Sequence, residues 1–177
     1  MPLIRLFTTA EASSDLLAEI RHLLDDAFGG HFTDDDWEHT RGGWHVVVVD
    51  GGVVVSHAAV VPRVIHVADR PLSTGDVEAV ATAPGRQREG LGTLAMGELA
   101  TVLRREFEMG ALSTGLHEFY WRLGWERWRG PTFVRTGTET IRTPDEDDGV
   151  MVLRFGPSRD IDLAAPISCE ARPGGDW

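Results

Sequence analysis

The sequence predicts an α/β fold in which helices flank a mixed β-sheet. Two β-branched runs surround an Asp-Gly-Gly turn in residues 44–61, a pattern typical of an antiparallel hairpin. A strand, a turn and a long helix follow over residues 77–107, in the order of a βαβ unit. Because 177 residues suffice for one sizeable core, we expect a single domain over residues 1–177.

The elements before the hairpin are short. Residues 3–7 are mostly apolar and predict an opening strand. Residues 13–30 carry apolar side chains at helical spacing, with Ser13 or Ser14 as the N-cap and two glycines at the end. Residues 34–40, which read DDDWEHT, predict a second helix whose acidic first turn suits the helix dipole.

The hairpin leads into the longer elements of the chain. Residues 63–83 are predicted to continue its second strand, turn and form a further strand. A helix opens after Gly90 and keeps its apolar residues on one side as far as Phe107. The tail after Phe155 is expected to be irregular. Smaller elements before it are a strand over 111–113, a helix over 117–125, strands over 127–136 and 150–155, and an acidic loop over 143–149.

The charge balance limits the partners. The chain has 17 basic and 28 acidic residues, a formal charge of −11, which argues against nucleic acid or anionic membrane and permits a cationic partner. With no apolar run near the ~20 residues that span a membrane and no secretory signal, we expect a cytoplasmic protein. Cys169 is expected to be a small buried hydrophobe. The histidines show no metal spacing, so no metal is expected, and His57 and His66 are expected to pack or face solvent.

A glycine-punctuated turn opens the long helix. Residues 87–92 read QREGLG, so Gly90 and Gly92 allow a ligand to approach the backbone closely. The helix N-terminus and Arg88 add positive potential, which favours a pyrophosphate. The spacing is neither that of a Walker loop nor that of a dinucleotide fingerprint. A helix start with glycines for packing is the alternative.

This turn, in its context, resembles the acetyl-coenzyme A loop of the GCN5-related N-acetyltransferases (GNAT), which reads Arg/Gln-x-x-Gly-x-Gly/Ala. The resemblance covers most of the chain and implies a splayed mixed sheet with helices on both faces. It also implies acetyl-CoA as co-substrate, with its pantetheine arm beside the backbone of Val80, Ala81 and Thr82. The pyrophosphate would lie on Gln87, Arg88, Glu89, Gly90, Leu91 and Gly92.

Tyr120, the only tyrosine, follows the next predicted strand. In the GNAT family a tyrosine at this place protonates the leaving thiolate of coenzyme A. A phenol of pKa ~10 can donate to a thiolate of pKa ~8.5 once water is excluded. The alternative is an aromatic packing residue, as we expect for Phe119, Trp121 and Trp125.

Glu78 precedes the strand that would flank the thioester. Its carboxylate can take the proton of an attacking amine, directly or through water, and can first hold the ammonium form. The alternative is a strand-end glutamate that faces solvent.

A closer resemblance is to the aminoglycoside 2′-N-acetyltransferases of actinobacteria. It rests on HFTDDDWEHTRGG, VEAVA, GALSTG, WRGPT, RTPDEDDG and the end at Trp177. This resemblance implies a homodimer that acetylates the 2′-amine of aminoglycosides, which are cationic substrates. Glu78 and the terminal carboxylate of Trp177 would handle the amine and its water. The antibiotic would be held by Asp36, Glu78, Ser113, Asp147 and Trp177.

Four positions depart from the pattern of that subfamily. His31 stands where an acid is usual, and Ala79 where a glycine is usual. The late acidic loop is one residue longer, which brings Glu146 beside Asp147 as a candidate, and Asp176 lies directly before Trp177. All four lie on the acceptor side. Two other functions therefore stay open: a GNAT enzyme for another polyamine or metabolic amine, and a non-catalytic protein that binds acyl-CoA or cationic drugs.

Overall fold

The computed structural model describes residues 1–177, which gather into two compact units. Unit 1 comprises residues 1–61 and 77–102, and unit 2 comprises residues 62–76 and 103–177. Two long strands, β3 (Val53–Val67) and β4 (Arg70–Thr82), contribute to both units. The single domain expected over the whole chain stays a prediction.

Unit 1 is built on an antiparallel arrangement of β1 (Leu3–Thr8), β2 (Trp44–Asp50) and the first part of β3. The hairpin turn has positive φ angles of 59° at Gly51 and 83° at Gly52, as the sequence predicts. The end of β4 completes the strands of this unit.

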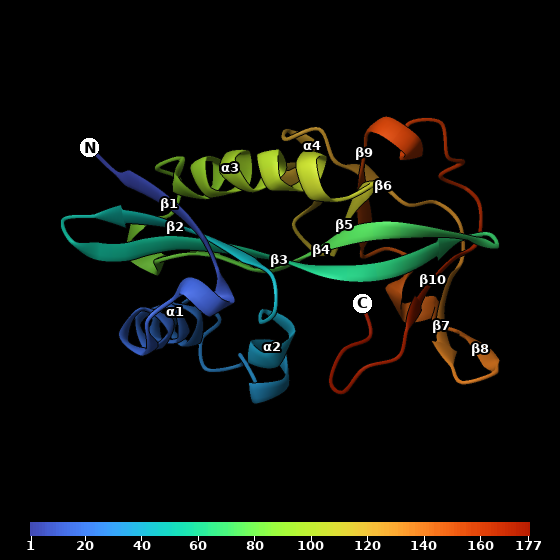
Figure 1. Ribbon diagram of the computed structural model, residues 1–177, viewed down its shortest axis with the longest axis horizontal. Helices are drawn as coiled ribbons and strands as arrows, with labels where there is room; N and C mark the ends of the chain where they lie inside the picture. The colour runs from blue at the N-terminus through green and yellow to red at the C-terminus, as the bar shows by residue number, and fades with distance from the viewer. The chain divides into compact units, whose positions relative to one another are not determined.

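Three helices belong wholly or mainly to unit 1. They are α1 (Ser14–Ala27), α2 (Asp34–His39) and α3 (Leu91–Glu106). The Ser13 hydroxyl accepts a hydrogen bond from the Leu16 N–H at 3.2 Å and caps α1. Figure 1 shows α1 and α2 on one side of β2 and β3, and α3 on the other. The core between α1 and the strands contains Ile20, Leu23, Leu24, Phe32, Val47, Val54 and Ala81.

Unit 2 holds the rest of a mixed sheet. The strands run in the order β6-β9-β5-β4-β3-β10-β7-β8. The β4–β5 and β10–β7 pairs are parallel, and the other pairs with a defined register are antiparallel. The mixed sheet predicted from the sequence is therefore confirmed. The new elements are β5 (Met109–Ser113), α4 (His117–Trp121), β6 (Glu126–Arg127), β7 (Thr132–Thr136), β8 (Glu139–Arg142), β9 (Val150–Arg154) and β10 (Ile167–Glu170).

Several local predictions were wrong. The tail is not wholly irregular, because β10 pairs with β3 and β7. The strand predicted over 127–136 is broken into β6 and β7 by a segment that contains Gly130 and Pro131. The side chain expected in the core at Trp121 is 70% exposed.

Cys169 and His57 are both buried. Cys169 is fully buried, as predicted, and burial raises the pKa of its thiol to about 11. His57, which was expected to pack or face solvent, is fully buried and hydrogen-bonded. No helix has both the length and the apolar character to cross a membrane.

Candidate active site

The last residues of β4 form the first part of the site and lie in unit 1. The Ser56 hydroxyl donates to the Ala81 carbonyl at 2.8 Å and lies 3.0 Å from the Thr82 hydroxyl. The Ala83 N–H donates to the Val55 carbonyl at 2.9 Å. β3 therefore fixes one edge of the segment at Ala81 and Ala83, just before the turn.

The turn that follows combines left-handed backbone with the start of α3. Arg88 has φ 68° and Gly90 has φ 82°. A Cβ at Gly90 would meet no atom within 4 Å, so glycine is needed there for its backbone conformation rather than for space. The first N–H groups of a helix lack carbonyl partners within the helix, and alternating backbone conformations turn such groups toward one point. The residues present therefore fit a pyrophosphate.

Two arginines near this turn differ in their availability. The Arg86 guanidinium donates to Glu89 at 2.8 Å and to Asp50 at 2.9 Å. These hydrogen bonds raise the pKa of Arg86 and balance its charge. Arg88 is exposed and is the cation left on the turn.

Glu78 and Ala79 lie within β4, where the backbone of Ala79 departs from the extended conformation. Ala79 has φ 51°, a left-handed conformation that costs an alanine about 1–2 kcal/mol. Its carbonyl accepts a hydrogen bond from His57 Nδ1 at 2.8 Å. Glu78 is half-buried. The left-handed residue Ala79 thus lies directly between Glu78 and the segment that begins at Val80.

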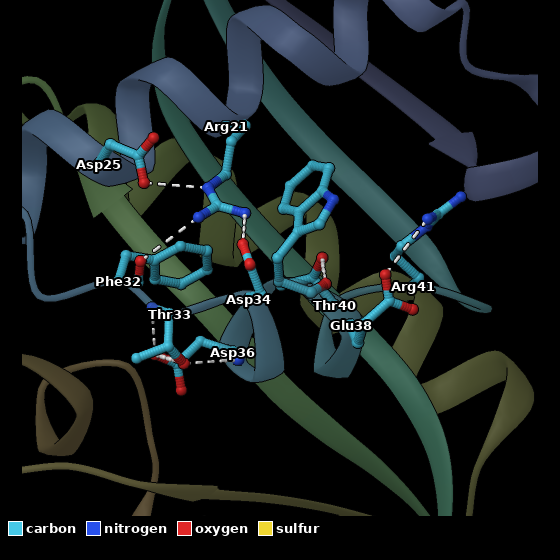
Figure 2. Close-up of polar contacts among 10 residues, drawn as sticks. Arg21, Asp25, Phe32, Thr33, Asp34, Asp36, Glu38, Thr40 and Arg41 are labelled. Carbon is cyan, nitrogen blue, oxygen red and sulfur yellow. Dashed lines mark hydrogen bonds and ion pairs between the residues drawn. The ribbon is translucent and has the colours of Figure 1, made fainter. Parts of the chain in front are cut away.

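The region between α1 and α2 is organised by Arg21 (Figure 2). Its guanidinium donates to Asp25 at 2.9 Å, to Asp34 at 3.1 Å and to the Phe32 carbonyl at 3.4 Å. It also lies over the ring of Phe32 at 5.5 Å and that of Trp37 at 5.9 Å. Arg21 therefore ties the loop before α2 to α1.

Two predicted acceptor residues belong to this region. The Asp36 carboxylate accepts from the N–H and the hydroxyl of Thr33, both at 2.8 Å, in a capping box (Figure 2). Asp36 thus has a structural role in α2. His31 is exposed beside the loop.

Tyr120 lies in α4 of unit 2 and is 7% exposed. Its ring packs edge-on against Phe119 at 4.9 Å and Trp125 at 6.2 Å. Burial raises the pKa of Tyr120 to about 12, so the phenol stays protonated at neutral pH. A protonated phenol in an apolar surrounding is the state that a general acid needs.

Ser113 and Glu146 meet at the end of β5. A Cβ at Gly149 would lie 2.6 Å from Ser113 Oγ and 3.9 Å from Glu146 Oε2, so only glycine leaves room there. Burial raises the pKa of Glu146, and the carboxylates of Asp145 and Asp176 raise it further. An ammonium group would relieve this repulsion.

Asp147 has a different environment, although it is the next residue. Its carboxylate makes two hydrogen bonds with Arg142, and it accepts from the N–H and the hydroxyl of Thr132 at 3.0 and 2.9 Å. The Arg142 guanidinium holds the pKa of Asp147 well below its usual range. This carboxylate is already compensated within the chain.

The carboxyl terminus is held by a buried ionic cluster that we call the carboxyl-terminal clamp: Arg63, Asp76 and Arg172. Asp76 Oδ2 lies 2.9 Å from Arg63 and 3.3 Å from Arg172, and its side chain is only 8% exposed. Arg63 donates to the Asp176 carbonyl at 2.8 Å, and Asp176 Oδ1 accepts from the Arg172 N–H at 3.0 Å. Trp177 packs against the core of unit 2. The Asp176 side chain thus shapes the tail.

The structure gathers the predicted site residues within each unit. Unit 1 contains Glu78, Ala79, the cofactor segment and the region of Asp36 and His31. Unit 2 contains Tyr120, the Ser113–Glu146 pair and the tail. No group of three or more His, Cys, Asp or Glu side chains is arranged to hold a metal ion. Sequence reasoning missed the clamp and the histidine behind Ala79.

Comparison with known proteins identifies the family. The acetyltransferase (GNAT) domain family matches residues 8–128. The chain belongs to the GCN5-related N-acetyltransferases. It is an acyltransferase, and acetyl-CoA is the co-substrate of this family. The aminoglycoside 2′-N-acetyltransferase of Mycolicibacterium fortuitum is 37% identical to it, over 98% of this chain and 91% of that protein.

Solved structures share the GNAT fold at low identity. Escherichia coli YhbS in complex with CoA has a TM-score of 0.67 and 18% identity, over 95% of this chain and 89% of that one. A GNAT acetyltransferase from Brucella melitensis in complex with acetyl-CoA has a TM-score of 0.62 and 18% identity, over 93% and 94%. Other matches are to longer chains, of which this acetyltransferase spans 33% and 35%. The GNAT fold predicted from the sequence is thereby confirmed.

Proposed function

We propose that this acetyltransferase transfers the acetyl group of acetyl-CoA to the 2′-amine of aminoglycosides. The observation that carries the proposal is the likeness to the Mycolicibacterium fortuitum enzyme, which extends over 98% of the chain. Aminoglycosides carry several ammonium groups, and the formal charge of −11 suits such a substrate. Aminoglycoside resistance would follow from this activity.

The proposed chemistry assigns one proton to each of two residues. The amine nitrogen attacks the thioester carbonyl, so a C–N bond forms and the C–S bond breaks. Glu78 accepts the proton of the amine through water, together with the terminal carboxylate of Trp177. Tyr120 donates its phenol proton to the thiolate as it leaves, a role supported by the burial that keeps the phenol protonated.

The acceptor would be held by carboxylates that are not already neutralised. Glu146, beside Ser113, has a raised pKa and gains from a cation, whereas the charge of Asp147 is balanced by Arg142. We therefore assign the main acceptor contact of the late loop to Glu146. Asp176 contributes its charge, and Asp36, His31 and Ala79 remain proposed acceptor contacts.

The cellular setting is also part of the proposal. We expect a cytoplasmic homodimer, since CoA thioesters are used inside cells and the subfamily resembled by this sequence is dimeric. Nucleic acid and membrane are not expected as partners, because the acidic surface opposes both.

The direct test measures thiol release from acetyl-CoA with gentamicin, tobramycin, amikacin or spermidine as acceptor. Turnover with the first two and little with amikacin, which lacks a 2′-amine, is the expected result. Turnover with spermidine alone would move the assignment to another amine, and binding without turnover would indicate a non-catalytic protein. Tyr120→Phe should lower kcat about 100-fold with little change in acetyl-CoA affinity. An unchanged kcat would remove Tyr120 from the chemistry.

A further inference from the structure

A continuous row of hydrogen bonds crosses the interior of unit 1 and ends on β4. Thr9 Oγ1 lies 2.8 Å from His45 Nε2, and His45 Nδ1 lies 3.0 Å from His57 Nε2. His57 Nδ1 lies 2.8 Å from the carbonyl oxygen of Ala79. Both imidazoles are fully buried. We call Thr9, His45 and His57 the histidine chain.

The Ala79 carbonyl at one end of the histidine chain determines where each hydrogen of the chain lies. The Ala79 carbonyl can only accept, so His57 carries its hydrogen on Nδ1 and presents Nε2 as an acceptor. His45 must therefore donate from Nδ1, and its Nε2 accepts from the Thr9 hydroxyl. Thr9 Oγ1 accepts in turn from the Gly42 N–H at 3.1 Å. No polar atom of the row is left unpaired.

Both rings are neutral, in agreement with this arrangement. Burial lowers the pKa of His45 to about 4, and the charge of Arg41 adds to the effect. Burial lowers the pKa of His57 to about 3. A neutral pair is satisfied by the hydrogen bonds present, whereas a charged pair would need a counter-ion in the core.

The far end of the row holds a strained residue. Ala79 keeps φ at 51°, a conformation that is disfavoured for an alanine. A hydrogen bond between neutral groups, made to a buried carbonyl, is of the same order as that cost and can offset it. Without the hydrogen bond from His57, we expect the backbone at Ala79 to relax toward an ordinary extended conformation.

We propose that the histidine chain is a positioning device for acetyl transfer, which holds Ala79 and thereby aims the Val80 N–H and the Glu78 side chain. In a trans peptide the N–H points opposite to the carbonyl of the same plane. Anchoring the Ala79 carbonyl on His57 therefore fixes the direction of the Val80 N–H. That N–H is the backbone donor that we assign to the thioester carbonyl. This role rests on the proposed function for its consequence in turnover.

The test uses variants that remove or retain the donor to Ala79. His57→Leu should lower kcat about tenfold, with KM for the aminoglycoside changed less than about threefold, because a misaimed donor costs transition-state stabilisation. His57→Asn, whose amide can still donate, should keep more of the activity than His57→Leu. Adding Ala79→Gly to His57→Leu should restore kcat to within about threefold of the wild type, because glycine adopts this φ without strain. His66→Leu, on the same strand, is the matched control and should leave kcat unchanged.

Calorimetry separates this role from the choice of acceptor. His57→Leu should reduce the affinity for acetyl-CoA about threefold and leave the affinity for CoA unchanged, because only acetyl-CoA has a thioester carbonyl for the Val80 N–H. This readout holds even if the wild type acetylates no aminoglycoside. Unchanged kcat and unchanged acetyl-CoA affinity in His57→Leu would overturn the proposal. So would failure of Ala79→Gly to restore a lost kcat, since the histidine would then act only on stability.

Discussion

The two units anchor their parts of the catalytic machinery by different means. In unit 1, the histidine chain holds Ala79 with neutral hydrogen bonds and no formal charge. In unit 2, the carboxyl-terminal clamp holds the tail with buried ions, Asp76 between Arg63 and Arg172. Each anchor fixes backbone next to a carboxylate that the proposed reaction uses, Glu78 in one case and the terminus of Trp177 in the other.

The difference follows from what each carboxylate has to do. A cation beside a general base lowers its pKa and weakens it, so a neutral anchor suits the position next to Glu78. The clamp contains two guanidiniums, and both pair with Asp76. It holds the tail through Asp176, because Arg63 donates to the Asp176 carbonyl and the Asp176 carboxylate accepts from the Arg172 N–H. Its ions therefore act on the backbone of the tail.

Acidification should disrupt the histidine chain, and this is the largest expected effect on stability. The unfolded chain binds protons at both histidines below their ordinary pKa of 6.5, while the folded rings resist until about 4 and 3. Stability is unaffected above pH 6.5 and falls as the pH drops toward 4, by about 5 kcal/mol for the two rings at about pH 4.5. Denaturant unfolding from pH 7 to pH 4.5 measures this loss.

The double variant His45→Asn/His57→Asn isolates that effect from other acid-sensitive groups. It should be less stable than the wild type at pH 7 and lose less stability on acidification, because neither amide titrates. His22→Asn, at an exposed position on α1, should follow the wild-type profile. Parallel profiles for the wild type and the double variant would show that the rings are not held neutral.

Replacement of Asp76 should disrupt the carboxyl-terminal clamp, and this is the next largest expected effect on stability. Asp76→Asn leaves two arginines facing each other in a site where the carboxylate is 8% exposed. Removing one partner of a buried ion pair costs about 4 kcal/mol, measured by denaturant unfolding at pH 7. The tail should also loosen, so carboxypeptidase should release Trp177 faster than from the wild type.

A matched control distinguishes burial from charge alone. Asp69→Asn removes an exposed carboxylate from the same unit and should leave both stability and tail release unchanged. If Asp76→Asn behaves like Asp69→Asn, the clamp does not hold the tail.

Local signals predicted the elements that depend on local interactions. The Ser13 cap, the Asp50-Gly51-Gly52 turn and the apolar face of α3 each act within a few residues, and the structure confirms all three elements. β10 was missed because its four residues are a strand only through pairing with β3 and β7, which are distant in sequence. Burial of Trp121 was wrong because hydrophobicity alone does not tell which side of a short helix faces solvent.

The candidate site shows the same difference between features set by local sequence and features set by distant residues. The Gln87–Gly92 turn was visible as a motif, but the state of each charged residue was not. The histidine chain had a signal that could have been used: a tight turn at residues 50–52 brings His45 and His57 near each other across the hairpin. The clamp had none, since Asp76 meets Arg172 across 96 residues of sequence. The compensation of Asp147 by Arg142 depends on the 3-10 turn Pro144–Glu146, which lies between the two residues in the sequence.

The smallest expected effects concern two neighbouring carboxylates of the late acidic loop. The charge of Asp147 is balanced by Arg142, whereas that of Glu146 lies near other carboxylates. Replacing each carboxylate with an amide should therefore change a different measured quantity. Glu146→Gln should raise KM for the aminoglycoside about tenfold, since one ammonium contact is worth about 1.4 kcal/mol, with stability unchanged. Asp147→Asn should change KM less than about threefold and lower stability by about 1 kcal/mol, because it loosens Arg142 and Thr132.

The exposed carboxylate of Glu139, on β8 of the same unit, provides the control for this pair of variants. Glu139→Gln should leave KM and stability near the wild-type values. The reverse pattern, with KM raised by Asp147→Asn and stability lowered by Glu146→Gln, would contradict the assignment. An acceptor-binding role for Asp147 would then require Arg142 to release it when the cationic substrate arrives. Since ionic partners exchange only when the newcomer binds more strongly, that outcome would place the specificity of the late loop on a competition between the drug and Arg142.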